Sequence, residues 1–193
     1  MSSLVISGDT SGTVTLAVPA VAGSNTLTLQ AATATSSVNT LATAVTSTSG
    51  TSIDFTSLPS WVKRITVMFI GVSGSGTSFP TVRLGTVSGF ETTGYSGSTQ
   101  FGTGAVTFTT GFEFASNIAT AARLYHGAMT LTLQNSSTNT WAETSIVGCS
   151  DGAAAAIGGG SKSTASVVTQ LRITFVNGTD TFDAGSVNIL YEG

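Results

Sequence analysis

Charged residues are scarce in this sequence. Asp, Glu, Lys and Arg make up 8% of its 193 residues, against about 25% in a typical soluble domain. The nine acids and six bases give a formal net charge of −3, and apart from the pair Lys63-Arg64 they stand singly along the chain. A chain without a basic patch has no footprint for nucleic acid, so we expect no nucleic-acid partner.

Cysteine and long apolar runs are also nearly absent. The single cysteine, Cys149, excludes an internal disulfide, which fits synthesis in a reducing cytoplasm. The longest apolar run, Ile65 to Val72, falls far short of the roughly 20 residues of a membrane helix, so we expect no membrane insertion. The start Met1-Ser2-Ser3-Leu4 lacks the features of a signal peptide, so no export through a secretion pathway is expected.

Aromatic residues are missing from residues 1–50, which contain one charged residue, Asp9. All ten Phe, both Trp and all three Tyr lie later in the chain, so a globular core begins near residue 50. We therefore expect two parts, residues 1–49 and residues 50–193, with the boundary near residue 49.

Two stretches of the first part alternate apolar with polar residues, as half-buried strands do. Their apolar members are Val14, Leu16, Val18, Leu27 and Leu29. No aromatic core is available to cover these faces, so we predict that the five side chains lie at a trimer or particle interface. In residues 31–48, the spacing of Val38, Leu41 and Val45 fits a helical seam, whereas the Ser and Thr content fits an extended linker, and both alternatives stay open.

Gly, Ser and Thr are abundant, with 23 Gly alone. These residues disfavour helix interiors, whereas Thr suits strands and Gly and Ser suit turns, so the predicted fold class is all-β. Strong alternation predicts strands in residues 62–72, 124–134, 171–175 and 187–191. Weaker patterns predict strands in Ser52–Phe55, Thr81–Leu84, Ala105–Thr109 and Trp141–Val147. About eight strands favour a jelly-roll-like β-sandwich that follows an amino-terminal, trimerising β-strand extension.

Candidate catalytic residues are few and form no recognisable constellation. The single histidine, His126, alternates with threonines opposite the apolar face of its strand, which indicates a surface or interface position. Cys149 has no basic neighbour in the sequence and is expected to be a small core or edge residue. No spacing distinguishes the acids Glu113, Asp180 and Asp183 from turn residues. We therefore expect no catalytic, cofactor or metal site, and a protein that is not an enzyme.

Two glycine-containing motifs are interpreted as turns. The run Gly158–Ser163 is similar to the end of a phosphate-binding loop, but Ser161 stands where glycine must precede the lysine. A flexible hairpin loop is therefore the better interpretation of this run. Asn177-Gly178 is typical of a tight hairpin turn between two strands.

The Gly-rich connection Ser88–Thr103 carries three aromatic residues, Phe90, Tyr95 and Phe101. Aromatic side chains in a loop stack on sugar rings or anchor a protein contact, so these three are our candidates for contact with a host-surface glycan or protein. The alternative role of the same side chains is to fold back over the edge of the sandwich.

Four segments carry a resemblance to a known family. The first half contains Ile6-Ser7-Gly8-Asp9-Thr10-Ser11-Gly12 and Asn25-Thr26-Leu27-Thr28-Leu29. The second half contains Gly50-Thr51-Ser52-Ile53-Asp54-Phe55-Thr56 and Val62-Lys63-Arg64-Ile65-Thr66-Val67-Met68-Phe69. The first two resemble a segment of fibre proteins of tailed bacteriophages, especially marine and cyanobacterial ones. The last two look like the start of a terminal domain on such fibres.

The resemblance implies a virion protein that is made in the host cytoplasm and assembles as a homotrimer with other virion proteins of the tail or capsid. It implies a tail fibre or fibre-like protein involved in host attachment. Long tail fibres carry a large amino-terminal anchor that we expect to be missing before Ile6, so a capsid decoration protein is the alternative. A carbohydrate-binding module and a depolymerase are the alternatives from other classes of protein.

Overall fold

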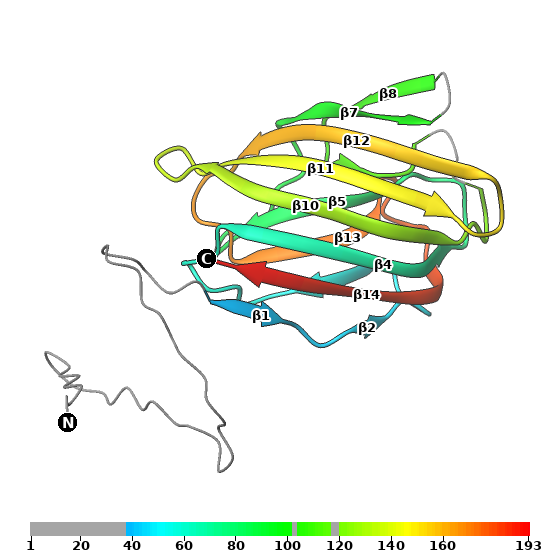
Figure 1. The fold of residues 1–193 in the computed structure, drawn as a ribbon, viewed down its shortest axis with the longest axis horizontal. Coiled ribbons are helices and arrows are strands. Elements are labelled where there is room, and N and C mark those ends of the chain that lie inside the picture. Colours follow the sequence, from blue (N-terminus) through cyan, green and yellow to red (C-terminus); the bar gives the residue numbers. More distant parts are fainter. Residues whose placement is uncertain (1–37, 102–103, 117–119) are drawn as a thin grey trace, which may run out of the picture. The chain divides into compact units, whose positions relative to one another are not determined.

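The computed structural model describes residues 38–101, 104–116 and 120–193. Within these ranges the chain forms β-strands and no helix. The strands pair in antiparallel fashion and make two sheets, and the larger sheet lies in front of the smaller one in Figure 1. The expected all-β class is therefore confirmed.

The larger sheet has nine strands and the smaller has five. The order in the larger sheet is β1 (Asn39–Leu41), β14 (Phe182–Glu192), β4 (Arg64–Gly74), β10 (Tyr125–Asn135), β11 (Thr140–Cys149), β12 (Ala154–Ser163), β7 (Tyr95–Phe101) and β8 (Gly104–Phe108), and β2 (Val45–Thr46) also pairs with β14. The order in the smaller sheet is β3 (Ser52–Phe55), β13 (Gln170–Phe175), β5 (Pro80–Thr86) and β6 (Gly89–Phe90), and β9 (Phe112–Glu113) pairs with β5. The sequence patterns did not indicate β1, β2, β6, β7, β9 and β12.

The inward side chains of both sheets form one hydrophobic core. Ile65, Val67 and Phe69 of β4 are completely buried, and they belong to the same cluster as Leu171 and Ile173 of β13. This is the alternation that the sequence predicted for both strands, and it is confirmed. The two sheets thus exclude water from each other's apolar faces, which is the main favourable term in folding.

The larger sheet begins earlier in the chain than the boundary expected near residue 49. Asn39 of β1 lies opposite Glu192, and Val45 of β2 lies opposite Val187. From residue 38 to residue 48 the chain is extended or turning. The helical seam proposed for residues 31–48 is therefore wrong for this part of the segment, and the extended alternative holds. β1 and β2 therefore belong to the same sheet as the last strand, β14 (Figure 1).

The glycine-rich run Gly158–Ser163 is part of a strand, so the expected flexible hairpin loop is wrong. β12 pairs with β11 over its whole length and with β7 on its other side. The Phe108 ring lies against Gly160, where an added Cβ would come within 2.8 Å of Phe108 Cζ. Glycine at position 160 thus leaves space for an aromatic ring of the core.

The turn predicted at Asn177-Gly178 is confirmed, but it does not close a hairpin. Gly178 has a φ of 69°, and its N–H donates a hydrogen bond of 3.0 Å to the carbonyl of Phe175. The strand before this turn, β13, belongs to the smaller sheet, whereas the strand after it, β14, belongs to the larger one. The turn therefore carries the chain from one sheet to the other.

Candidate functional site

The outer face of the larger sheet consists mainly of uncharged side chains. Along β11 the inward residues are buried, whereas Ala142, Thr144 and Ile146 between them are exposed. Along β12 and β7 the outward positions are likewise uncharged, and all but Ile157 are small, hydroxyl or amide residues. These positions are Ala155, Ile157, Gly159, Ser161, Ser96, Ser98 and Gln100. The face is therefore neutral over three adjacent strands.

Isoleucine side chains stand exposed in the middle of this face. Ile146 of β11 is 68% exposed and lies directly opposite Ile157 of β12, which is 59% exposed. The same cross-strand row continues through Ala128 and Met68 on β10 and β4. On β4, Ile70 is a further exposed isoleucine of this sheet. We call the pair Ile146 and Ile157 the isoleucine ridge.

A shallow hollow lies on each side of the isoleucine ridge. One hollow, of about 170 Å³, lies between β12 and β7 and is lined by Ser98, Gln100 and residues 157–159. The other, of about 370 Å³, lies between β10 and β11 and is lined by residues 127, 128, 130 and 144–146. The face thus has both a projection and depressions, and none of the lining side chains is charged.

Charge lies at the margin of this face. Arg64 and Glu192 stand opposite each other at the ends of β4 and β14, and Arg64 Nε lies 3.4 Å from Glu192 Oε2. The Arg64 side chain is 54% exposed, so water screens this ion pair. Because this pair lies at the ends of β4 and β14, the central rows of the face stay neutral.

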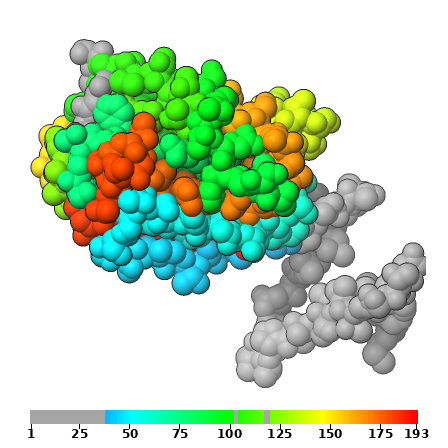
Figure 2. Space-filling model, turned by 180° about the vertical axis from the view of Figure 1, so that it is seen from behind, coloured from blue at the N-terminus to red at the C-terminus, as the bar shows by residue number. Residues whose placement is uncertain are grey.

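The outer face of the smaller sheet differs, because it carries an ion pair and a partly exposed ring. Arg172 of β13 binds Asp54 of β3 through two hydrogen bonds of 2.7 Å, and this raises the pKa of the guanidinium. The same guanidinium lies 4.1 Å from the centre of the Phe90 ring. Arg83 of β5 stands in the same row. Figure 2 shows the molecule from this side, with β3 in cyan beside β13 in orange.

The three aromatic candidates for host contact lie in strands rather than in one loop. Phe90 is half-buried in β6 beneath Arg172, and Phe101 is half-buried at the end of β7. Tyr95 is 3% exposed and takes part in the core. The segment between residues 88 and 103, expected to be a connection, therefore holds β6 and β7, and Tyr95 has the inward orientation that was the alternative.

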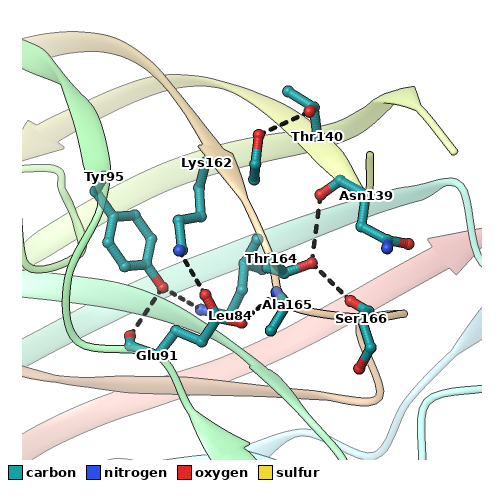
Figure 3. Close-up of polar contacts among 10 residues, drawn as sticks. Leu84, Glu91, Tyr95, Asn139, Thr140, Lys162, Thr164, Ala165 and Ser166 are labelled. Atoms are coloured by element: carbon teal, nitrogen blue, oxygen red, sulfur yellow. Dashed lines mark hydrogen bonds and ion pairs between the residues drawn. The ribbon is translucent and has the colours of Figure 1, made fainter. Parts of the chain in front are cut away.

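Tyr95 joins a buried polar network, which Figure 3 shows. The Leu84 N–H donates to the Tyr95 hydroxyl at 2.8 Å, and that hydroxyl donates to the Glu91 carbonyl at 3.1 Å. Lys162 Nζ of β12 lies 2.5 Å from Glu91 Oε2, and Glu91 Oε1 accepts a hydrogen bond from the Ala165 N–H at 2.7 Å. Burial raises the pKa of the Tyr95 hydroxyl, which keeps it neutral as a donor. The network ties together segments that are far apart in the sequence.

The inner face of the larger sheet carries a second buried polar group. Glu143 of β11 is 2% exposed, and neither of its carboxylate oxygens has a hydrogen-bond partner. The buried hydroxyls of Ser145 and Thr99 and the indole N–H of Trp141 are also unpaired. Burial raises the pKa of Glu143 to about 7, although the nearby Ser145 hydroxyl acts in the opposite direction. The carboxyl group is thus held in surroundings that disfavour its ionised form.

His126 lies on the outer side of β10, as the sequence indicated. Its Nδ1 accepts a hydrogen bond of 3.2 Å from the Gly71 N–H, and its Nε2 lies 3.0 Å from Ser150 Oγ. An Nδ1 atom that accepts leaves the proton on Nε2, which then donates to Ser150. Gly71 has a φ of 61° where the pairing of β4 with β10 shifts register, so the imidazole stabilises a bulge.

The remaining candidate residues are dispersed. Cys149 is half-buried at the end of β11, and burial raises the pKa of its thiol. Burial also raises the pKa of Glu113, whose Oε2 accepts a hydrogen bond of 2.7 Å from Ser116 Oγ. Asp180 accepts hydrogen bonds from Ser78 and Asn177, so it orders the turn before β14. Within the described ranges, no three His, Cys, Asp or Glu residues come together as metal ligands, and no helix is long and apolar enough to cross a membrane.

The sequence contained a signal for the isoleucine ridge. Trp141, Glu143 and Val147 have the same parity along β11, so the adjacent Ile146 must point the other way. The interface candidates of the first segment, Val14, Leu16, Val18, Leu27 and Leu29, lie outside the described residues. Comparisons of the chain with protein-family models, with curated proteins and with solved structures found no match.

Proposed function

We propose that this chain is a structural protein of a tailed-bacteriophage virion, namely a trimeric tail fibre or fibre-like protein that takes part in host attachment. The observation that carries the proposal is the neutral outer face of the larger sheet, with its exposed isoleucine ridge. Exposed apolar patches of this kind mark surfaces that contact other proteins. The resemblance to phage fibre proteins supports the virion as the assembly in which the contact is made.

The two antiparallel sheets are compatible with a more specific fold. We propose a β-sandwich of jelly-roll type that contains residues 50–193 together with β1 and β2. Residues 1–37 would act as the trimerising extension, through the alternating apolar residues that the sequence analysis identified. The chain would work by binding rather than by catalysis.

A capsid decoration protein is the second candidate function. The same neutral face supports it, because a decoration protein also buries a broad surface against its neighbours. A carbohydrate-binding module or a depolymerase has less support. One of the three aromatic side chains proposed to contact sugar, Tyr95, is 3% exposed and engaged in the network of Figure 3.

Localisation on purified phage particles tests the proposal. An antibody raised against the full chain would be imaged on particles by electron microscopy, and the particle proteins would be identified by mass spectrometry. We expect the chain in the particles and the label on the tail. Label on the head would replace the fibre by a decoration protein, and particles that lack the chain would overturn the virion proposal.

A further inference from the structure

The isoleucine ridge lacks a cover in the described chain, although its surroundings would let it pack against protein. Ile146 and Ile157 stand opposite each other on neighbouring strands, and each is more than half exposed. Both belong to strands that are paired on both sides, so the ridge does not lie at the edge of the sheet. A contact made here would therefore use side chains rather than free backbone groups.

The charge distribution favours a second copy of this chain as the occupant. When two copies of one surface meet, any charged group near the centre is brought close to its own copy, and like charges are repelled. The ridge and the two hollows beside it carry no charged side chain. The ion pair Arg64–Glu192 lies at the margin and is balanced within one copy. This face can pack against itself without such repulsion, whereas the smaller sheet presents Arg83 directly opposite Arg172, and only Arg172 is paired with Asp54.

The size and relief of the face also suit a second copy. Six adjacent strands, β14, β4, β10, β11, β12 and β7, form its central part. At a spacing of about 4.8 Å and about 3.3 Å per residue, strands of some ten residues cover roughly 900 Å². A standard interface takes about 800 Å² from each partner. The ridge of one copy has hollows on the neighbouring copy in which to pack, since both features occur on one face.

We propose that the outer face of the larger sheet is the contact between copies of this chain, with the isoleucine ridge of each copy packed on the outer face of its neighbour. The inference rests on the proposed function, because it adds to the amino-terminal extension a second surface through which copies of the proposed virion protein meet. Burial of the two isoleucine side chains would stabilise the oligomer through the hydrophobic effect.

The test is the molar mass of the purified full chain at micromolar concentration, measured by light scattering. The wild type is expected as an oligomer. The double variant Ile146→Asp and Ile157→Asp places charge against charge in the contact, and it should weaken association at this face by about a hundredfold or more, which lowers the molar mass below that of the wild type. Both side chains are exposed in the single copy, so circular dichroism should show an unchanged fold.

Two further variants separate this contact from a general effect of added charge. Val87→Asp adds one charge of the same sign at a position that is 84% exposed in the turn between β5 and β6, and it should leave the oligomer intact. Thr144→Arg adds the opposite charge beside the ridge, and it should lower the molar mass as the aspartates do. A monomeric wild type, or a molar mass that neither the aspartates nor Thr144→Arg lowers, would overturn the inference.

Failure of this inference and failure of the proposed function give different results. Virions that contain the chain as an oligomer insensitive to the ridge variants would keep the virion role and remove this contact. An oligomer that depends on the ridge but is absent from virions would keep the contact and remove the virion role.

Discussion

Lys162 Nζ lies 2.5 Å from Glu91 Oε2 and 5.4 Å from the centre of the Tyr95 ring. The Lys162 side chain is 8% exposed, whereas the Arg64 side chain, which pairs with Glu192, is 54% exposed. The first ion pair is therefore shielded from water and the second is screened by it. This difference makes the two pairs a matched test of what burial adds to an ion pair in this fold.

Removing the lysine from the shielded pair should be costly. Lys162→Met leaves the Glu91 carboxylate without its partner, and we expect the free energy of unfolding to fall by about 2–3 kcal/mol. Arg64→Met removes a screened cation, and we expect a fall below about 1 kcal/mol. Urea denaturation of the two variants and the wild type measures both changes. Equal effects of the two substitutions would contradict this view of the Lys162 pair.

Glu143 should make stability depend on pH. Its pKa rises from an ordinary 4.5 to about 7 on folding, so the folded state holds the proton more tightly than the unfolded chain. The contribution of Glu143 to the free energy of unfolding is then fully present below about pH 4.5. It is lost as the pH rises to about 7, by up to about 1.4 kcal/mol per pH unit. Glu143→Gln should remove this slope from the profile of the wild type.

Denaturation midpoints measured from pH 4 to pH 9 would compare the two proteins. Ser145→Ala serves as a second variant, because it removes the hydroxyl that favours the ionised carboxylate. It should extend the slope to higher pH without removing it. Parallel profiles for the wild type and Glu143→Gln would show that Glu143 does not titrate in this range.

Two neighbouring glycines of β12 should differ in their tolerance of alanine. At Gly160 an added Cβ would lie 2.8 Å from the Phe108 ring and 2.9 Å from the Ser96 carbonyl, and at Gly159 the nearest atom is 3.7 Å away. Gly160→Ala should cost about 1–3 kcal/mol through overpacking. Gly159→Ala should be neutral or slightly stabilising, because alanine restricts the unfolded chain. Thermal unfolding of both variants checks this, and a loss at Gly159 as large as at Gly160 would speak against the packing of Phe108.

Phe90 is a better probe of host attachment than Tyr95, because the Tyr95 side chain is buried in the core and its removal would destabilise the fold. Phe90→Ala removes a half-buried ring that stacks on Arg172, and it should cost about 1 kcal/mol of stability. If this side of the molecule contacts the host, adsorption of particles to cells should fall at least about tenfold. Val87→Ala, in the adjacent turn, is the control and should adsorb normally. Normal adsorption by stable particles that carry Phe90→Ala would favour capsid decoration.

Local sequence patterns were enough to predict the class of the fold and the inward faces of its most strongly alternating strands. Ile65, Val67 and Phe69 alternate with less buried residues, and so do Leu171 and Ile173. The period of two is a local property of the strand backbone, so it can be read along the chain without knowing which strand lies beside it.

Which strands are neighbours, and which side chains lie between the sheets, depends on contacts between distant parts of the chain. Asn177-Gly178 was correctly predicted as a turn, but the sheet that receives the following strand depends on partners far away in the sequence. Gly158–Gly160 carry no hydrophobic pattern, and their place in a strand depends on pairing with β11 and β7 and, at Gly160, on the Phe108 ring that packs there. Tyr95 and Glu143 are buried because other strands cover them. Such contacts join residues distant along the chain, and no local pattern encodes them.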